Sequence, residues 1–143
     1  SGHIFLIRKT ILDKIGFFDP NYFMNFEERD LFKKMKKKNY KVFVKKNIYA
    51  KHLEGKASDI KFQHETDYTS KWHFGWGNLY FLKKYYGTIV SILFYIYYFI
   101  YYTSKYFYFF IRNEKKKSSL MFALIRGMTA AVLNKKSYYR PKI

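Results

Sequence analysis

The chain has 143 residues and a mass of 17.6 kDa, which is the size of one ordinary domain. It contains no cysteine, and this excludes both a disulfide framework and a thiolate metal site. Lys and Arg number 28 against 10 Asp and Glu, so the formal net charge is +18, and 24% of the residues are aromatic. A chain that is both basic and aromatic is suited to nucleic acid or to an anionic membrane surface.

The charges are unevenly distributed along the chain. Nine of the ten acids precede residue 68, and only Glu114 follows it. Residues 1–67 carry 15 basic and 9 acidic side chains, a net charge of +6, whereas residues 68–143 carry 13 and 1, a net charge of +12. This shift indicates a first part of mixed charge and a strongly basic tail that associates with a membrane.

The first predicted elements are short. Residues 3–7 are apolar and predict a strand. Thr10 and Asp13 form a capping-box pattern that opens a helix over residues 10–15, and Gly16 ends it, because glycine readily takes the positive φ of a helix C-terminus.

A second helix is predicted over residues 27–38, with Asn25 as its N-cap. Acids fill its first turn and lysines its last, as the helix dipole favours. Residues 40–44 then alternate between apolar and polar, which predicts a strand with one buried face. Residues 51–67 have no clear periodicity and predict a surface loop.

The remaining chain predicts helices that favour a membrane. Residues 68–86 form an aromatic amphipathic pattern that ends at a glycine, and residues 88–111 hold twelve Tyr or Phe and a single charge, Lys105. The uncharged stretch 88–104 is at the short end of what crosses ~30 Å of hydrocarbon, so a tilted span and an interfacial helix both remain open. A second apolar segment, 119–133, has basic flanks. We expect attachment at the cytoplasmic face of the plasma (inner) membrane, peripheral or as a single span.

The most informative stretch covers residues 16–31 and reads G-F-F-D-P-N-Y-F-M-N-F-E-E-R-D-L. It resembles the second half of the catalytic domain of family 2 glycosyltransferases, where a G-x-F-D-E-x-F-F segment leads into E-D-x-D-L-x-x-R and a lysine-rich turn. Three later elements are similar to the family in the same order: K-N-Y-K-V at residues 38–42, an H-x-x-x-x-x-S element at residues 52–58, and Asn78 in W-G-N-L-Y.

The resemblance implies an α/β fold, with residues 1–87 forming the C-terminal, acceptor-side part of a GT-A-type (nucleotide-diphospho-sugar transferase) domain. Residues 88–143 would follow as an aromatic, basic tail of membrane-associated helices, similar to the extensions of rhamnosyltransferase-like members. The chain begins at Ser1 without Met or a signal-peptide pattern, so we expect the back part of a longer protein. The family's nucleotide-binding half and its D-x-D metal motif come earlier, so this segment alone is expected to be inactive.

The activity that the resemblance implies is inverting transfer of a sugar from a nucleotide-sugar donor to a glycan or lipid-linked acceptor, in bacterial cell-surface polysaccharide synthesis. Such transfer needs a carboxylate within ~3 Å of the acceptor hydroxyl to take its proton. Glu28 stands where the family places this base, usually as the shorter Asp. The competing interpretation is that Glu28 closes a capping box with Asn25.

Four further residues match acceptor-side positions of the family: Glu27, Asp30, Trp76 and Asn78. For Asp30 a plain first-turn helix acid is nearly as good an interpretation. His52 matches a metal ligand of some members and would help to hold the Mn²⁺ or Mg²⁺ that neutralises the departing diphosphate, the other ligands coming mainly from the preceding half. His64 and His73 have no such match and are predicted to lie on the surface.

A different class of function is a membrane-bound basic adaptor for nucleic acid or anionic lipid. The net charge and the interleaved aromatic residues favour it. The lysines at positions 33–38 are already explained by the helix dipole, however, and no nucleic-acid motif is present. The leading hypothesis therefore expects no nucleic-acid partner.

Overall fold

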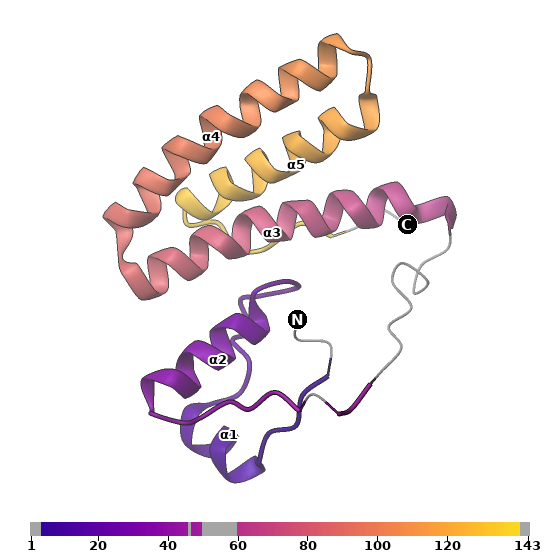
Figure 1. Ribbon diagram of the computed structural model, residues 1–143. Helices are drawn as coiled ribbons and strands as arrows, with labels where there is room; N and C mark the ends of the chain where they lie inside the picture. The colour runs from indigo at the N-terminus through magenta and orange to yellow at the C-terminus, as the bar shows by residue number, and fades with distance from the viewer. Residues whose placement is uncertain (1–3, 46, 50–59, 141–143) are drawn as a thin grey trace.

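The computed structural model describes residues 4–45, 47–49 and 60–140. Within these ranges the regular elements are all helical: α1 (Lys9–Ile15), α2 (Glu27–Lys37), the short 3-10 helix η1 (Ile60–Phe62), α3 (Gln63–Tyr86), α4 (Thr88–Ile111) and α5 (Lys115–Val132). The helices α3, α4 and α5 pack together, and α1 and α2 lie on the side of α3 away from α4 (Figure 1).

The predicted α/β fold is wrong, because the described residues contain five α-helices and no strand. Residues 40–44, predicted as a strand, have no regular structure, and Val42, Phe43 and Val44 are exposed. Residues 4–7 of the other predicted strand are irregular too. A strand must exchange backbone hydrogen bonds with a neighbouring strand, and none exists in the described part of the chain.

The first two helices lie where they were predicted, although their start signals differ. α1 ends at Gly16, whose φ is 81° and whose N–H bonds to the carbonyl oxygen of Leu12 at 2.8 Å. α2 is preceded by Phe26 as its N-cap and not by Asn25, and no side chain caps either helix. Asn39, with a φ of 59°, follows the end of α2 in the left-handed conformation that asparagine tolerates.

α3 and α5 are longer than the predicted segments, and α4 covers residues 88–111 as predicted. α3 begins at Gln63, so residues 63–67 are helical and not part of a loop, while residues 51–59 of the predicted loop lie outside the described residues. The boundary predicted after residue 87 falls in the turn between α3 and α4. α3 nevertheless packs against both α4 and α5, so the two sides of that boundary share one core.

Two glycines allow α3 and α5 to approach closely. A Cβ atom on Gly127 of α5 would lie 2.0 Å from the carbonyl oxygen of Trp72, and one on Gly75 of α3 would lie 2.5 Å from the carbonyl oxygen of Leu124. The backbones are therefore nearly in contact. Around this contact lie buried side chains from three segments: Tyr22, Phe26, Trp72, Trp76, Leu79, Ala123, Met128, Ala130 and Ala131.

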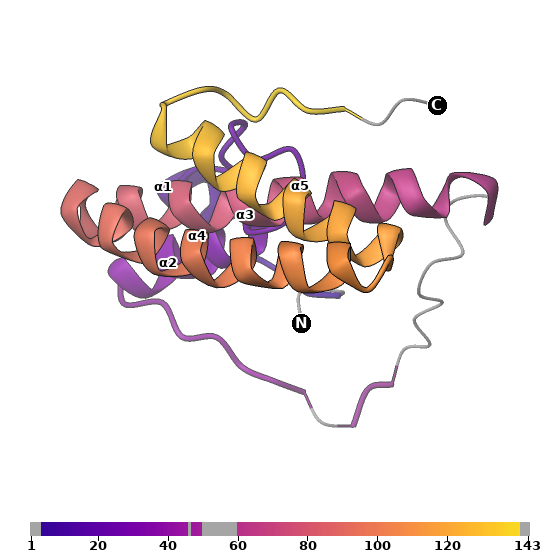
Figure 2. The ribbon, with the colours of Figure 1, turned by 90° about the horizontal axis from the view of Figure 1, so that it is seen from above.

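The segment after α5 runs back along α3 (Figure 2). His73 and Trp76 of α3 donate hydrogen bonds to the carbonyl oxygens of Tyr139 and Lys135, each at 2.8 Å. The Ser137 hydroxyl donates to the carbonyl oxygen of Asn21 at 2.5 Å. The end of the described chain thus ties α3 to the loop that precedes α2.

Residues 88–111 form α4, the helix for which a tilted span and an interfacial position were both open. Among the residues that the structure describes, none of the helices has the length and apolar character needed to cross a membrane.

Candidate functional site

The predicted base lies in the first turn of α2, which also carries Glu27. The two residues before this turn, Asn25 and Phe26, both have a positive φ, of 66° and 71°. Such values are uncommon for residues other than glycine, so tertiary contacts must hold them. The side-chain amide of Asn25 donates a hydrogen bond from Nδ2 to the carbonyl oxygen of Ser70 on α3 at 3.1 Å, and the Phe26 side chain is buried in the core. These contacts fix the backbone at which Glu27 and Glu28 begin the helix.

Asp30, two residues after Glu28 on α2, is fully buried. Its Oδ1 accepts hydrogen bonds from Lys84 Nζ at 2.6 Å and from the Tyr85 hydroxyl at 2.9 Å, and its Oδ2 lies 3.4 Å from Lys34 Nζ. A carboxylate taken out of water is costly unless an opposite charge and hydrogen bonds compensate it. The contacts from α3 supply that compensation.

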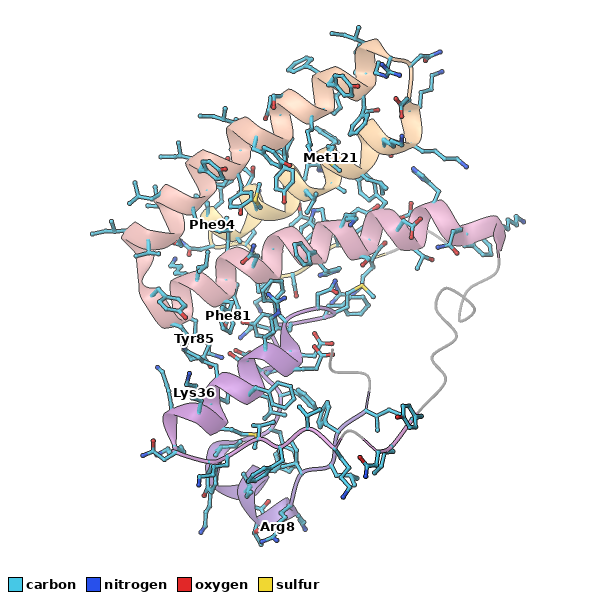
Figure 3. All side chains as sticks on the ribbon, viewed as in Figure 1. Arg8, Lys36, Phe81, Tyr85, Phe94 and Met121 are labelled. Carbon is cyan, nitrogen blue, oxygen red and sulfur yellow. The ribbon has the colours of Figure 1, made fainter. Side chains whose placement is uncertain are left out.

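Lys84 also binds a second carboxylate. Its Nζ lies 2.7 Å from Asp19 Oδ2, which accepts a further hydrogen bond from the Tyr80 hydroxyl at 3.0 Å. We call Asp19, Asp30, Tyr80, Lys84 and Tyr85 the Lys84 cluster. It joins the loop before α2, α2 itself and α3, and Figure 3 shows Tyr85 on the side of α3 that faces α2.

The Lys84 cluster favours the charged forms of Asp19 and Lys84 and the neutral form of Tyr85. Burial alone would raise the pKa of Asp19, but hydrogen bonds from Lys84 and from Asn21 outweigh it and lower the pKa to about 2. Burial would likewise lower the pKa of Lys84, and the two carboxylates raise it instead. The pKa of Tyr85 is raised, first by burial and then by its hydrogen bond to Asp30.

The lowered pKa of Asp19 predicts that the folded protein loses stability in acid. The pKa of Asp19 is about 2 in the folded protein and ~3.9 in an unfolded chain. Its contribution is therefore complete above about pH 4 and is lost as the pH falls toward 2. Urea unfolding between pH 5 and pH 2 should show a smaller loss of stability for Asp19→Asn than for the wild type. Equal losses in the two proteins would contradict the prediction.

The pKa of Glu27, the first of the two adjacent acids, is raised. Both are half-buried, and one carboxylate oxygen of Glu27, Oε2, is buried without a hydrogen-bond partner. Burial raises the pKa of Glu27 and the charge of Glu28 raises it further, while a hydrogen bond with its own backbone partly lowers it. A carboxylate with a raised pKa is a better proton acceptor, and such groups occur often at functional sites.

The capping interpretation of Glu28 is wrong. A capping box needs a side chain at the N-cap that bonds to the helix, and here the N-cap is Phe26, with no side-chain cap hydrogen bond. Asn25, the expected cap, donates to α3 instead. The catalytic role of Glu28 stays a prediction.

The other predicted acceptor residues, Trp76 and Asn78, lie on α3. Trp76 is buried in the core and stacks on Tyr80 with a centroid distance of 4.7 Å, whereas Asn78 is half-buried. Trp76 therefore has a packing role, and the acceptor role of both residues stays a prediction. His64 is exposed as predicted, but His73 is buried and not on the surface, and burial lowers its pKa.

The predicted metal ligand, His52, lies outside the described residues. Within the described ranges there is no group of three or more His, Asp or Glu side chains that could hold a metal ion. The requirement for Mn²⁺ or Mg²⁺ therefore stays a prediction.

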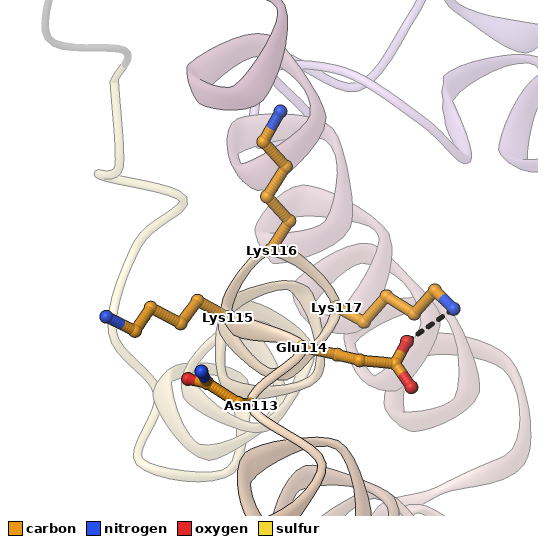
Figure 4. A pocket seen from close by; sticks show the side chains of 5 residues that line it. All are labelled: Asn113, Glu114, Lys115, Lys116 and Lys117. Atoms are coloured by element: carbon orange, nitrogen blue, oxygen red, sulfur yellow. Dashed lines mark ion pairs between the residues drawn. The ribbon is translucent and has the colours of Figure 1, made fainter.

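The structure also contains an open depression at the turn between α4 and α5, lined by Asn113, Glu114, Lys115, Lys116 and Lys117. Lys117 pairs with Glu114 at 2.5 Å, as Figure 4 shows. The depression lies far from α2, at the opposite end of the molecule (Figure 1). It brings none of the predicted site residues together.

The sequence interpretation missed Asp19 and Lys84. Asp19 belongs to the F-D-P turn that carries the resemblance, and its position there was the one available signal. Lys84 stands in a Lys-Lys-Tyr-Tyr run, and its sequence neighbours do not distinguish it from Lys83.

Comparisons of the chain with protein-family models, with curated proteins and with solved structures find no match. The functional interpretation therefore rests on the ordered motifs and on the geometry around α2.

Proposed function

We propose that the chain is the acceptor-side segment of an inverting glycosyltransferase. It would act with a nucleotide-sugar donor and a glycan or lipid-linked acceptor in bacterial cell-surface polysaccharide synthesis. The observation that carries the proposal is the pair of adjacent carboxylates in the first turn of α2, Glu27 and Glu28, on backbone that contacts with α3 hold in place. The order of the glycosyltransferase-like motifs along the sequence supports the same reaction.

In this reaction a side chain of the protein must accept one proton, that of the acceptor hydroxyl. The acceptor oxygen forms a bond to the anomeric carbon while the bond from that carbon to the diphosphate oxygen breaks. The acceptor proton passes to the Glu28 carboxylate, which acts as the general base. Asp30 does not need to touch the acceptor for this, because its contact with Lys84 positions α2 and hence Glu28. A divalent ion would neutralise the departing diphosphate, with His52 as one ligand.

The test is Glu28→Gln in the complete enzyme, with Glu27→Gln as the matched control. We expect turnover to fall by about 10²-fold or more in Glu28→Gln, the usual contribution of a general base, with the helix content and donor binding unchanged. Because Glu28 does not cap α2, the amide removes no cap hydrogen bond. The measurement is release of the nucleoside diphosphate in the presence of acceptor.

Because Glu27 is a predicted acceptor-binding residue, Glu27→Gln should raise the KM for the acceptor while kcat stays within about tenfold of the wild type, whereas Glu28→Gln lowers kcat itself. A large loss in Glu27→Gln together with near-normal turnover in Glu28→Gln would make Glu27 the base. Near-normal turnover in both variants would contradict the proposal that α2 supplies the base.

A further inference from the structure

α4 buries one side and exposes the other. The side that packs toward α3 and α5 carries these buried or half-buried residues: Ser91, Phe94, Tyr95, Tyr98, Tyr102, Tyr106 and Phe109. The opposite side carries a row of apolar residues, which we call the outer face of α4, with the exposed fraction of each: Ile89 (77%), Leu93 (64%), Ile96 (50%), Ile100 (65%), Phe107 (54%) and Ile111 (81%). Figure 3 shows side chains projecting from α4 away from the other helices.

The outer face of α4 is long and uncharged. Its residues recur at helical spacing over the 24 residues of α4, a length of about 36 Å. Lys105 is the only charged residue of the helix, and it lies off this face, with its Nζ over the Tyr101 ring at 4.7 Å. An exposed apolar strip of this length, interrupted at Ser104 between Ile100 and Phe107, is unusual for a soluble monomer and marks a surface that another apolar phase covers.

Charged and phenolic groups border the outer face. Tyr97, Tyr101 and Tyr108 are exposed along one flank. Arg112 lies over the Tyr108 ring at 5.5 Å. Aliphatic residues flanked by tyrosines and basic side chains are the arrangement of a helix that lies in a membrane interface.

Charge decides between the occupants that could cover this strip. Residues 68–143 have a single acid, Glu114, and it is already paired with Arg112 at 3.0 Å and with Lys117 at 2.5 Å. A second copy of the chain would bring a net charge of +18 against another +18. An anionic lipid surface has the opposite charge and attracts juxtaposed lysines and arginines.

We propose that the outer face of α4 lies flat on an anionic membrane surface, with its aliphatic row at the boundary between headgroups and acyl chains. α5 stays out of the lipid, because most of its apolar residues, among them Ala123, Leu124 and Met128, are buried or half-buried against its neighbours, and Phe122 is the one large apolar side chain of α5 that is exposed. The earlier expectation that residues 119–133 form a second membrane segment is thereby replaced. This inference rests on the geometry of α4 and does not depend on the proposed transfer reaction.

The test is binding of the complete chain to sedimenting vesicles, which measures no enzymatic step. Vesicles of phosphatidylglycerol mixed with phosphatidylcholine are compared with vesicles of phosphatidylcholine alone. The variant Leu93→Glu/Ile100→Glu places two charges on the outer face. Its matched control, Phe43→Glu/Val44→Glu, makes the same change in charge at two exposed apolar residues away from α4.

We expect the wild type to bind the mixed vesicles and to bind phosphatidylcholine far less. The outer-face variant should lose at least about tenfold in affinity and the control less than about threefold, with unchanged helix content by circular dichroism. Equal losses in the two variants would show that only the change in net charge matters, and would overturn the proposal.

The proposal would also be overturned if the wild type failed to bind the mixed vesicles, or if it sedimented as a dimer that the outer-face variant converts to monomer. Single-stranded DNA binding that the outer-face variant abolishes, without vesicle binding, would assign the face to nucleic acid instead.

Discussion

Replacement of Gly127 by alanine should lower the free energy of unfolding by about 3 kcal/mol, the upper range for overpacking a well-packed core. The new Cβ atom would lie 2.0 Å from the carbonyl oxygen of Trp72, 2.9 Å from its carbonyl carbon and 3.1 Å from the backbone nitrogen of Trp76. All three atoms belong to the backbone of α3, so no side chain can rotate away. α3 and α5 would have to separate, and the core between them would loosen.

Helix propensity alone predicts the opposite sign. In an exposed helix interior alanine is more favourable than glycine by about 1 kcal/mol, so a stabilising effect would be expected if the two helices were apart. The measurement is urea unfolding followed by circular dichroism, and a Gly127→Ala protein as stable as the wild type would contradict the close contact.

Two other glycines of α3 give graded controls for this prediction. A Cβ on Gly75 would lie 2.5 Å from the carbonyl oxygen of Leu124, and one on Gly77 would lie 3.0 Å from a ring carbon of Phe26. A ring can shift where a backbone carbonyl cannot, so the loss of stability should decrease from Gly127 to Gly75 to Gly77. Another order would show that the backbone approach does not determine the cost.

The helices could be predicted from the sequence because their signals are local. The acids at one end of α2 and the lysines at the other, Gly16 after α1, and Gly87 between α3 and α4 act within a few residues of the boundary that they mark. The strand predicted at residues 40–44 failed because alternation shows which face could be buried and not whether a neighbouring strand exists.

The candidate site was predictable only in part, for the same reason. Glu27, Glu28 and Asp30 stand in one turn of one helix, so their proximity follows from the sequence. Lys84 lies 54 residues from Asp30 in the chain, and only the packing of α2 on α3 brings them together. The start of α2 at Glu27 was predicted correctly, but its N-cap was not: Asn25 satisfies the local preference for an N-cap, whereas in the structure it bonds to Ser70 and Phe26 occupies the N-cap position.

Removal of the Lys84 charge should be as damaging as the overpacked glycine. Lys84→Met largely keeps the length of the side chain and removes its charge. The fully buried Asp30 carboxylate then loses the Lys84 ammonium group, which lies 2.6 Å from its Oδ1. Breaking a buried ion pair by removing one partner costs about 3–5 kcal/mol. Because the Tyr85 hydroxyl and Lys34 still reach Asp30, we expect a loss near about 3 kcal/mol in urea unfolding, the lower end of that range.

A double-mutant cycle separates the ion pair from the loss of packing. Asp30→Asn keeps the shape of the side chain and removes its charge, and Lys84 retains Asp19 at 2.7 Å, so this variant should lose less stability than Lys84→Met. In Asp30→Asn/Lys84→Met the fully buried carboxylate is gone, and only the half-buried Asp19 is left without its lysine. The double variant should therefore be clearly more stable than the sum of the two single losses predicts, and its coupling should exceed about 1 kcal/mol. Losses that simply add would mean that Lys84 and Asp30 do not interact, and that apolar packing and the hydrogen bonds of Tyr85 and Asn25 hold α2 against α3 without this ion pair.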